Sequence, residues 1–472
     1  MKKDDQNVQP LRLDGQTLVD QLQTLASVGT DPRGGRTRLA ASKEEGKGRD
    51  LLVEWMKELD LEVTVDSVGN IFGLLSAEEG RTEEKPLVLG SHIDTVLSAG
   101  PYDGCFGVLS ALAVARAFRT AGRTPSRPLV VAAFTNEEGV RFQPDMLGSL
   151  CFAGGISPEE ALAVTDSHGI SLEESLKEIG YNGPLTPGFF APGEYLELHV
   201  EQGPILDREG LSIGVVEGVQ GISWWKIAFA GKANHAGTTP TALRSDAGYG
   251  AARTIVFLRE LALSSGTTLG TAGTLSLEPG AVNIIPSKAV FTADIRDPSE
   301  ERLAEADEKL KAFAEEVASA EGLEVTLERL ARFSPVEFSE SLCALVEETA
   351  RELGLSSRRM TSGAGHDAQM MARICPTAMI FVPSRGGISH NPDEHTDRAD
   401  LLAGAEVLLR TAEKLLAKEQ KEKNADQGQS GNRPSPLGDH AAPRQGDRNG
   451  APLNVGSRLG LRSKPRKGAG GT

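Results

Sequence analysis

Cysteine is scarce in this sequence, and the four residues are spread over 472 positions: Cys105, Cys151, Cys343 and Cys375. No two of them form a Cys-x-x-Cys pair, which excludes a zinc finger with thiolate ligands. Few and widely separated cysteines are typical of proteins from a reducing compartment, where disulfides do not persist.

The sequence also lacks long apolar runs. It contains no stretch of 18 or more apolar residues, so membrane insertion is not supported. The polar start, Met-Lys-Lys-Asp-Asp-Gln, is not followed by the apolar core of a secretory signal. We therefore expect a cytoplasmic protein.

An excess of positive charge is absent as well. The 50 Lys and Arg residues are outnumbered by 66 Asp and Glu, which gives a net charge of −16 and argues against a general nucleic-acid binder. We expect neither nucleic acid nor a membrane as a partner. The hydrophobic content of 39% and charged content of 25% are those of an ordinary soluble globular protein. The length of 472 residues predicts two domains, to which a tail can be added.

Apolar strands alternate with helical segments through the first half of the chain. Helices are predicted within residues 14–60 and at 104–120, and strands at 61–65, 71–75, 86–89, 129–134 and 195–200. Residues 129–134 are continuously apolar, as is typical of a strand that is buried on both faces. This pattern predicts an α/β fold in which helices cover a sheet.

The pattern changes near Gly214. Two predicted helices, 245–263 and 298–320, lie among four predicted strands at 224–229, 271–277, 289–296 and 324–329. Two helices among four strands predict a compact α+β insert that is ferredoxin-like in outline. The first pattern then resumes with a helix at 340–353, a strand at 378–382 and a closing helix at 399–416.

The apolar pattern stops near residue 418. Residues 424–472 contain 8 Lys and Arg against 3 Asp, a local charge of +5, with abundant Gly and Pro. Such a composition cannot bury enough apolar surface to offset its ordering entropy. We predict a disordered basic tail over residues 418–472, which either contacts an anionic partner or is a solvated appendage.

A histidine and two aspartates follow the predicted strand at 86–89. His92 comes after Leu87-Val88-Leu89, Asp94 lies two residues on, and Asp103 lies one loop later. Alternation along an extended segment puts His92 and Asp94 on the same face, where a carboxylate can orient an imidazole that binds metal. In isolation, the same residues are compatible with a surface loop.

Four more candidates lie at or just beyond the ends of other predicted strands: Glu137, Glu138, His199 and His390. In open α/β sheets, ligands bind at the carboxyl ends of the strands. Each residue alone has a structural explanation, such as a solvated Glu-Glu face or a core histidine. Their coincidence at one edge indicates a metal site.

Nitrogen and oxygen ligands without thiolate suit Zn²⁺, Mn²⁺, Ni²⁺ or Co²⁺, and the spacing does not choose among them. The set exceeds what one tetrahedral zinc needs, so two metals that share a bridging carboxylate fit better. One further carboxylate is then needed to move protons between water and the leaving nitrogen. The adjacent glutamates Glu137 and Glu138 can supply a ligand and a base.

Several motifs occur in order along the chain: Ser-His-Ile-Asp-Thr-Val (91–96), Tyr-Asp-Gly (102–104), Asn-Glu-Glu-Gly (136–139), Glu-Leu-His-Val-Glu-Gln-Gly-Pro (197–204), Ala-Asn-His-Ala-Gly-Thr-Thr-Pro (233–240), Gly-His-Asp-Ala (365–368) and Ser-His-Asn-Pro (389–392). Together, over roughly residues 15–417, they resemble the hydantoinase/carbamoylase family of di-metal amidohydrolases. That family includes N-carbamoyl-L-amino-acid hydrolases, allantoate amidohydrolases and β-ureidopropionases, and it is related to aminoacylases and carboxypeptidase-like metallopeptidases.

The resemblance implies a mixed-sheet, metallopeptidase-like catalytic domain with an inserted ferredoxin-like lid and dimerisation domain. The catalytic domain would comprise residues 1–214 and 330–417, and the insert residues 215–329. Two divalent ions per subunit are implied: one held by His92 and His199, the other by Glu138 and His390, with Asp103 as the bridge.

The resemblance also implies roles for residues around the metals. Glu137 would be the general base and Asp94 would orient His92, while His235 would reach the site of a neighbouring subunit in a homodimer and polarise the scissile carbonyl. The residues implied to contact substrate are Asn283, Arg296, Gln202 and Gly365.

Arg296 is also a candidate from the residues alone. It ends an alternating strand, and its planar fork suits a carboxylate, although an ion pair with Asp294 or Asp297 is the alternative. After Gly221 the chain has Ile222, where allantoate-type enzymes are expected to carry Gln, so this segment is more similar to the carbamoyl-amino-acid hydrolases.

We therefore predict an amidohydrolase that cleaves an N-carbamoyl-type C–N bond of a small carboxylate, using metal-bound hydroxide and a Glu base. The alternatives are an allantoate amidohydrolase or β-ureidopropionase, an aminoacylase or dipeptidase, and a non-catalytic binding protein. A binding protein would have no need of a proton shuttle such as Glu137.

Overall fold

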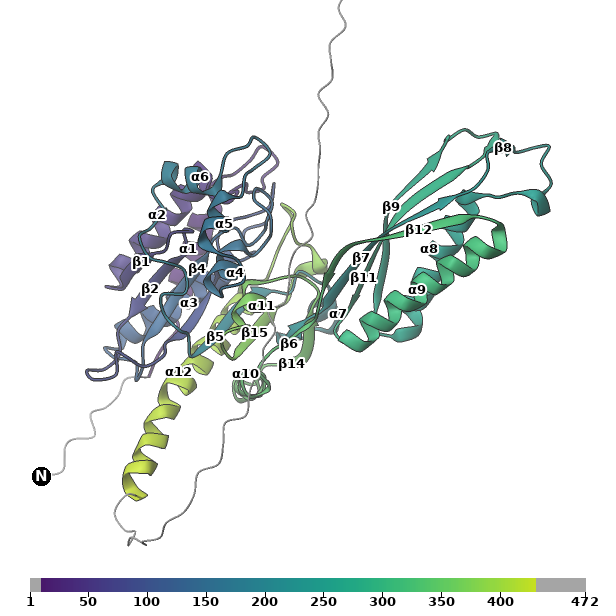
Figure 1. The fold of residues 1–472 in the computed structure, drawn as a ribbon. Coiled ribbons are helices and arrows are strands. Elements are labelled where there is room, and N and C mark those ends of the chain that lie inside the picture. The colour runs from purple at the N-terminus through teal and green to yellow at the C-terminus, as the bar shows by residue number, and fades with distance from the viewer. Residues whose placement is uncertain (1–9, 430–472) are drawn as a thin grey trace, which may run out of the picture. The chain divides into compact units, whose positions relative to one another are not determined.

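A computed structural model describes residues 10–429 of the chain, with side chains up to residue 417. The first half alternates helices and strands as predicted (Figure 1). Its main elements are α1 (Gly15–Ala26), α2 (Lys43–Glu58), β1 (Glu62–Val65), β2 (Ile71–Leu75), β3 (Leu87–His92), α3 (Cys105–Thr120), β4 (Leu129–Phe134), α4 (Leu147–Phe152), α5 (Pro158–Ala163), α6 (Leu172–Ile179) and β5 (Glu194–Val200).

The central sheet has nine strands in the order β1-β2-β4-β3-β5-β15-β6-β13, and β14 pairs beside β6. Strands β3, β4, β5 and β15 are mutually parallel, whereas β2 and β6 join them antiparallel, so the sheet is mixed. Its later elements are α7 (Ile205–Glu209), β6 (Ile213–Val219), β13 (Val336–Glu337), α10 (Glu340–Glu352), β14 (Ser357–Ser362), α11 (Asp367–Met371), β15 (Thr377–Val382), η2 (Arg385–Gly387) and α12 (Arg398–Gln429).

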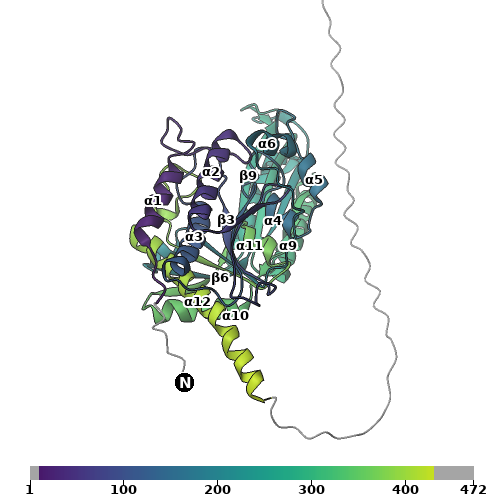
Figure 2. The ribbon, with the colours of Figure 1, turned by 90° about the vertical axis from the view of Figure 1, so that its left-hand side faces the viewer.

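Apolar side chains bury both faces of this sheet. Every residue of β3, β4 and β15 is buried, and for β4 the continuously apolar sequence of residues 129–134 predicted this. In Figure 2, α1, α2 and α3 lie to the left of β3, and α4, α5 and α11 lie to its right. Helix α3 is itself buried over nearly its whole length and packs against β3.

The parallel strands bring the predicted ligands to one edge of the sheet. His92 is the last residue of β3, Glu137 follows β4, His199 lies near the end of β5, and His390 follows β15. Because the carboxyl ends of parallel strands meet at the same edge, residues up to about 300 positions apart become neighbours.

A second, four-stranded antiparallel sheet has the order β12-β7-β11-β9. It is built from β7 (Gly221–Ala230), α8 (Ala247–Ser265), β9 (Leu269–Glu278), β11 (Lys288–Asp297), α9 (Glu300–Glu321) and β12 (Glu324–Phe333). Buried and partly exposed residues alternate along β11, and α8 and α9 pack on the sheet face that carries a separate apolar core (Figure 1). This βαββαβ order is that of a ferredoxin-like unit.

A two-stranded sheet pairs β8 (Asn234–His235) with β10 (Ile284–Ile285), and η1 (Thr241–Leu243) leads into α8. No helix in the described part of the chain combines the length and the apolar character that crossing a membrane requires.

The structure differs from the sequence prediction in several strands and in the tail. The strands that were not predicted are β6, β8, β10, β13 and β14. The pairing of β6 with β14 joins segments that are distant in the chain. Helix α12 continues to Gln429, so residues 418–429 of the predicted tail are helical. Their Lys, Glu and Gln residues have high helix propensity without an apolar face. The rest of the predicted tail lies outside the described residues.

Candidate metal centre

The imidazole of His92 is oriented by the backbone of the loop that follows β3. Its Nδ1 lies 3.0 Å from the Asp94 carbonyl oxygen, a geometry in which Nδ1–H donates and Nε2 keeps its lone pair. The Asp94 carboxylate lies 3.6 Å from Nδ1 and accepts the backbone N–H groups of Glu137 and Glu138 instead. Asp94 therefore orients the histidine chiefly through its carbonyl, not through the carboxylate that the sequence suggested.

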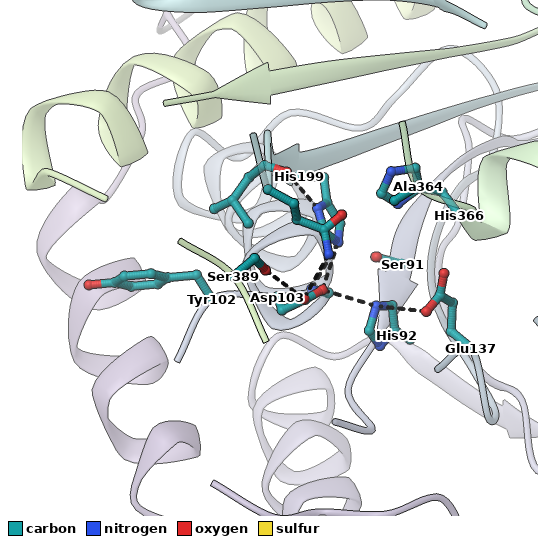
Figure 3. A network of polar contacts seen from close by, with 12 residues as sticks. Ser91, His92, Tyr102, Asp103, Glu137, His199, Ala364, His366 and Ser389 are labelled. Carbon is teal, nitrogen blue, oxygen red and sulfur yellow. Dashed lines mark hydrogen bonds and ion pairs between the residues drawn. The ribbon is translucent and has the colours of Figure 1, made fainter. Parts of the chain in front are cut away.

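Asp103 lies at the centre of three imidazoles. Its Oδ1 is 3.1 Å from Nε2 of His199 and 3.6 Å from Nε2 of His92, and its Oδ2 is 3.3 Å from Nε2 of His390. Figure 3 shows its carboxylate between the His92 and His199 rings. Burial would raise the pKa of Asp103, but its close contacts with His199, His390 and His92 hold that pKa well below its usual range.

The close approach of His92 depends on Gly104, which follows Asp103 with φ of +62°. A Cβ atom at this position would lie 2.4 Å from the His92 ring, so a side chain cannot be accommodated. Gln202 and His390 also have left-handed backbone, with φ of 57° and 53°. Such conformations are costly in non-glycine residues and cluster at functional sites.

Three groups of described side chains have the spacing of metal ligands, with the ligand atoms of each group within 4.8 Å of one another. Two of them share Asp103: His92, Asp103 and His199, and Asp103, Glu138 and His390. The third lies behind His199 and consists of Glu197, His199 and His366. The buried Oε1 of Glu138 has no hydrogen-bond partner among the described residues. An orphaned carboxylate oxygen in an all-nitrogen and oxygen donor set fits a divalent cation.

The adjacent glutamates have raised pKa values. Burial, and then the charge of Asp103, raise the pKa of Glu138 to about 8. Burial raises the pKa of Glu137 well above its usual range, and the neighbouring Glu138 adds to the shift although His92 opposes it. Crowded carboxylates repel one another, so a bound cation would be strongly favoured here.

Behind His199 lies a second layer of polar groups that were not predicted. His199 Nδ1 lies 2.8 Å from the Val200 carbonyl oxygen, which leaves Nε2 to face Asp103. His366 stacks edge-on against His199 at 4.6 Å between ring centroids and contacts the Ser362 hydroxyl at 2.9 Å. Burial, followed by the charge of His199, lowers the pKa of His366 well below its usual range. The sequence carried a signal for His366 in the Gly-His-Asp-Ala motif.

A buried carboxylate, Glu394, was also missed. Its Oε1 accepts the backbone N–H groups of Tyr102 at 2.8 Å and Asp103 at 3.3 Å, and its Oε2 accepts the Ser389 hydroxyl at 3.2 Å. It therefore ties the loop of Asp103 to the loop of His390. Figure 3 shows the Tyr102 ring pointing away from the cluster, so only its backbone takes part.

Gln202 lies within the cluster, where its side-chain amide donates to Asp103 Oδ2 at 2.9 Å and lies 3.4 Å from Nε2 of His390. Gly365 lies in the loop after β14, where an added Cβ would come within 3.0 Å of Met146. His235 and Asn283 lie exposed beside the two-stranded sheet, and none of the hydrogen bonds or ion pairs of the described residues joins them to the cluster.

A cavity of about 620 Å³ is lined by Gln202 of the cluster and by Asp294 and Arg296 of the four-stranded sheet. Arg296 forms an ion pair with Asp294, as the alternative interpretation of its sequence held, and it also donates to the Gly363 carbonyl at 3.0 Å. Asp297 instead accepts from Thr268 and Ser299.

A mixed α/β sheet with two overlapping histidine–carboxylate groups at its carboxyl edge defines a class of metal-dependent hydrolases. Residues 88–414 match peptidase family M20/M25/M40, and the chain belongs to this family.

Within that family, the chain belongs with the hydantoinase/carbamoylase amidases, which confirms the resemblance of its motifs. It is 40% identical to an N-carbamoyl-L-amino acid amidohydrolase of Geobacillus stearothermophilus, over 85% of this chain and 99% of that one. An allantoate amidohydrolase of Bacillus subtilis is 34% identical, over 84% and 97%. A hydantoinase/carbamoylase family amidase of Burkholderia multivorans superposes with a TM-score of 0.83 at 39% identity, over 85% of this chain and 98% of that one.

Proposed function

We propose that this chain hydrolyses the carbamoyl C–N bond of an N-carbamoyl-L-amino acid. The observation that carries the proposal is the pair of ligand groups that share Asp103, with Glu137 beside them. Four relatives at 37–40% identity are N-carbamoyl-L-amino-acid amidohydrolases, which supports this substrate class.

Two divalent ions would be held at the shared carboxylate. His92 and His199 would bind one, Glu138 and His390 would bind the other, and Asp103 would contact both. When bound, such a pair supplies Lewis-acid polarisation of a carbonyl and makes water a stronger nucleophile at neutral pH. The donor set suits Zn²⁺, Mn²⁺, Co²⁺ or Ni²⁺.

Glu137 would act as the proton carrier. Its Oε2 lies 3.5 Å from His92 Nε2, next to the two ligand groups, and its backbone N–H is held by Asp94. It would take a proton from the attacking water and deliver it to the leaving nitrogen as the C–N bond breaks. A raised pKa suits a carboxylate that must both accept and return this proton.

His235 would polarise the scissile carbonyl. Its Nδ1 accepts the backbone N–H groups of Gly237 at 3.0 Å and Thr238 at 3.2 Å. An Nδ1 that accepts leaves the proton on Nε2, which is then a hydrogen-bond donor on an exposed loop.

The Nε2–H group of His235 would reach the active site of the neighbouring subunit in a homodimer. The four-stranded sheet and its helices would form the lid and dimerisation domain. Strand β9 is an edge strand of that sheet and exposes Leu269, Leu275 and Leu277. On α8, Leu263 is 71% exposed. An unpaired edge with exposed leucines is suited to pairing with a second copy.

Arg296 and Asn283 would bind the substrate carboxylate, and Gln202 and Gly365 would also contact the substrate. Of these four residues, Arg296 and Gln202 line the cavity. We also propose a cytoplasmic location, because all four cysteines are free and buried. An allantoate or ureidoglycolate substrate is the alternative, supported by relatives of those names at 34–36% identity.

The test is a substrate panel on metal-loaded enzyme. N-carbamoyl, N-formyl and N-acetyl derivatives of one L-amino acid, 3-ureidopropionate and allantoate would be compared by kcat/KM. We expect the N-carbamoyl derivative to be turned over best. A higher kcat/KM for allantoate or for the N-acetyl derivative would overturn the proposal in favour of that activity.

A further inference from the structure

The guanidinium of Arg296 is largely committed before any ligand arrives. Asp294 accepts from Nε at 3.0 Å and from Nη2 at 2.9 Å, and the Gly363 carbonyl accepts from Nη1 at 3.0 Å. Arginine has five N–H donors. Two therefore remain, one on each terminal nitrogen, and two donors are what a single carboxylate uses in a bidentate pair.

The placement of Asp294 in the cavity follows from strand periodicity. Residues 294 and 296 of β11 lie on the same face, opposite the face that packs on α8 and α9. Both side chains are about one-third exposed and line the cavity. Asp297, on the other face, is fully buried and is held by Thr268 and Arg302. Asp294 is thus the carboxylate that a substrate bound at Arg296 would meet.

The cavity holds no second cation for an additional acidic group. Among the described residues that line it, Arg296 is the single positively charged side chain, whereas Asp294 and Glu201 are both acidic. The Glu201 carboxylate is already occupied, because its two oxygens accept the backbone N–H groups of Ile205 and Leu206 at 2.8 Å. A second substrate carboxylate would have no positively charged partner in this lining and would lie near the charge of Asp294, which is unfavourable.

We propose that Asp294 is a specificity-determining residue that restricts the cavity to substrates with one carboxylate and an uncharged side chain. The proposal rests on the proposed function, in which Arg296 binds the substrate carboxylate. Asp294 occupies the Nε and Nη2 edge of the guanidinium and leaves one N–H on each terminal nitrogen for the α-carboxylate. Its charge repels a second carboxylate, while Leu269, Met360 and Phe381 offer apolar surface to the rest of the side chain.

The experiment uses two substrates that differ in charge alone, N-carbamoyl-L-glutamine and N-carbamoyl-L-glutamate. We expect wild-type kcat/KM for the glutamine derivative to exceed that for the glutamate derivative by at least about 100-fold, because juxtaposed like charges cost several kcal/mol. Asp294→Asn keeps the side-chain shape and should reduce this ratio at least about 10-fold, mainly through the KM of the glutamate derivative. Asp294→Ala serves as a second variant.

The control is Glu328→Gln on strand β12 of the same sheet, which is separated from β11 by β7. It removes a carboxylate whose partner is the exposed Lys226. It should leave the ratio as in wild type. An unchanged ratio in both Asp294 variants, or equal wild-type turnover of the two substrates, would overturn the role of Asp294.

Binding separates this outcome from a failure of the proposed function. Calorimetry of both compounds with the Glu137→Gln variant measures affinity without turnover. If the glutamine derivative binds more tightly than the glutamate derivative but wild-type enzyme hydrolyses neither, the proposed reaction is overturned and the role of Asp294 is supported. Equal affinities, or no binding of either compound, would overturn that role.

Discussion

The carboxylate of Asp94 accepts the backbone N–H of Glu137 at 3.2 Å, which couples the end of β3 to the end of β4. The same carboxylate accepts the N–H of Glu138 at 3.3 Å. Both glutamates are thereby held at one corner of the sheet, with Glu137 directed to His92 and Glu138 to His390. Adjacent side chains that diverge in this way can take different roles.

Glu137→Gln should therefore lower turnover by at least about 10²–10⁴-fold while both metals are retained. The substitution keeps size and hydrogen bonding but removes the proton acceptor, and general-base catalysis is worth about 10²–10⁴-fold, or roughly 3–5 kcal/mol. Glu138→Gln should instead lower metal occupancy first, with activity partly rescued by excess metal. Kinetics with elemental analysis of both variants decides the matter. Loss of metal in Glu137→Gln alone would reverse the two assignments.

Removal of metal should abolish activity and lower thermal stability. Without cations, the carboxylates of Asp103, Glu137 and Glu138 face one another in a buried centre. A ligand that binds the folded state alone stabilises it by about 2.7 kcal/mol at 100 times its Kd. Chelator dialysis followed by calorimetry and assay measures both effects, and Mn²⁺, Co²⁺, Ni²⁺ or Zn²⁺ should restore them to different extents. Full activity in verified metal-free protein contradicts the prediction.

His235→Ala should depress turnover strongly and leave metal content unchanged, because His235 lies outside the ligand groups. If it serves a neighbouring subunit, a hybrid of His235→Ala and Glu137→Ala subunits contains one whole site per dimer. Activity should then return in purified heterodimers. Heterodimers without recovery would show that each site is built within a single chain.

The buried carboxyl of Asp66 predicts a pH dependence of stability away from the metal centre. Burial raises its pKa from 3.8 to about 7, although hydrogen bonds from Asn70 and Val68 oppose the shift. The folded state therefore holds this proton more tightly than the unfolded state. The stabilisation is fully present below about pH 4, is lost as pH rises to about 7, and falls by at most about 1.4 kcal/mol per pH unit.

Chemical denaturation of wild type and Asp66→Asn between pH 4 and 8 measures this contribution. The stability of wild type relative to the variant should fall over that interval and level off above about pH 7. A constant difference would show that Asp66 is already ionised in the folded protein.

The sequence by itself determined which residues end the parallel strands. Short apolar runs such as residues 129–134 identify buried strands, and the polar residues that follow them, Glu137 and Glu138, must then lie at a sheet edge. The same reasoning reached His92, His199 and His390, because local periodicity is set by the backbone and is readable without a structure.

Only the tertiary structure decided how these ends support one another. Glu394 accepts a hydrogen bond from the backbone N–H of Asp103, which lies about 290 residues away in the chain. No local sequence pattern encodes that contact. The pairing of β6 with β14 was missed for the same reason. Arg296 could have paired with Asp294 or with Asp297, and burial of the latter among Thr268 and Arg302 left Asp294 as the partner. Contacts between distant segments depend on the packed fold. They form only when the burial of both segments offsets the entropy cost of closing the loop between them.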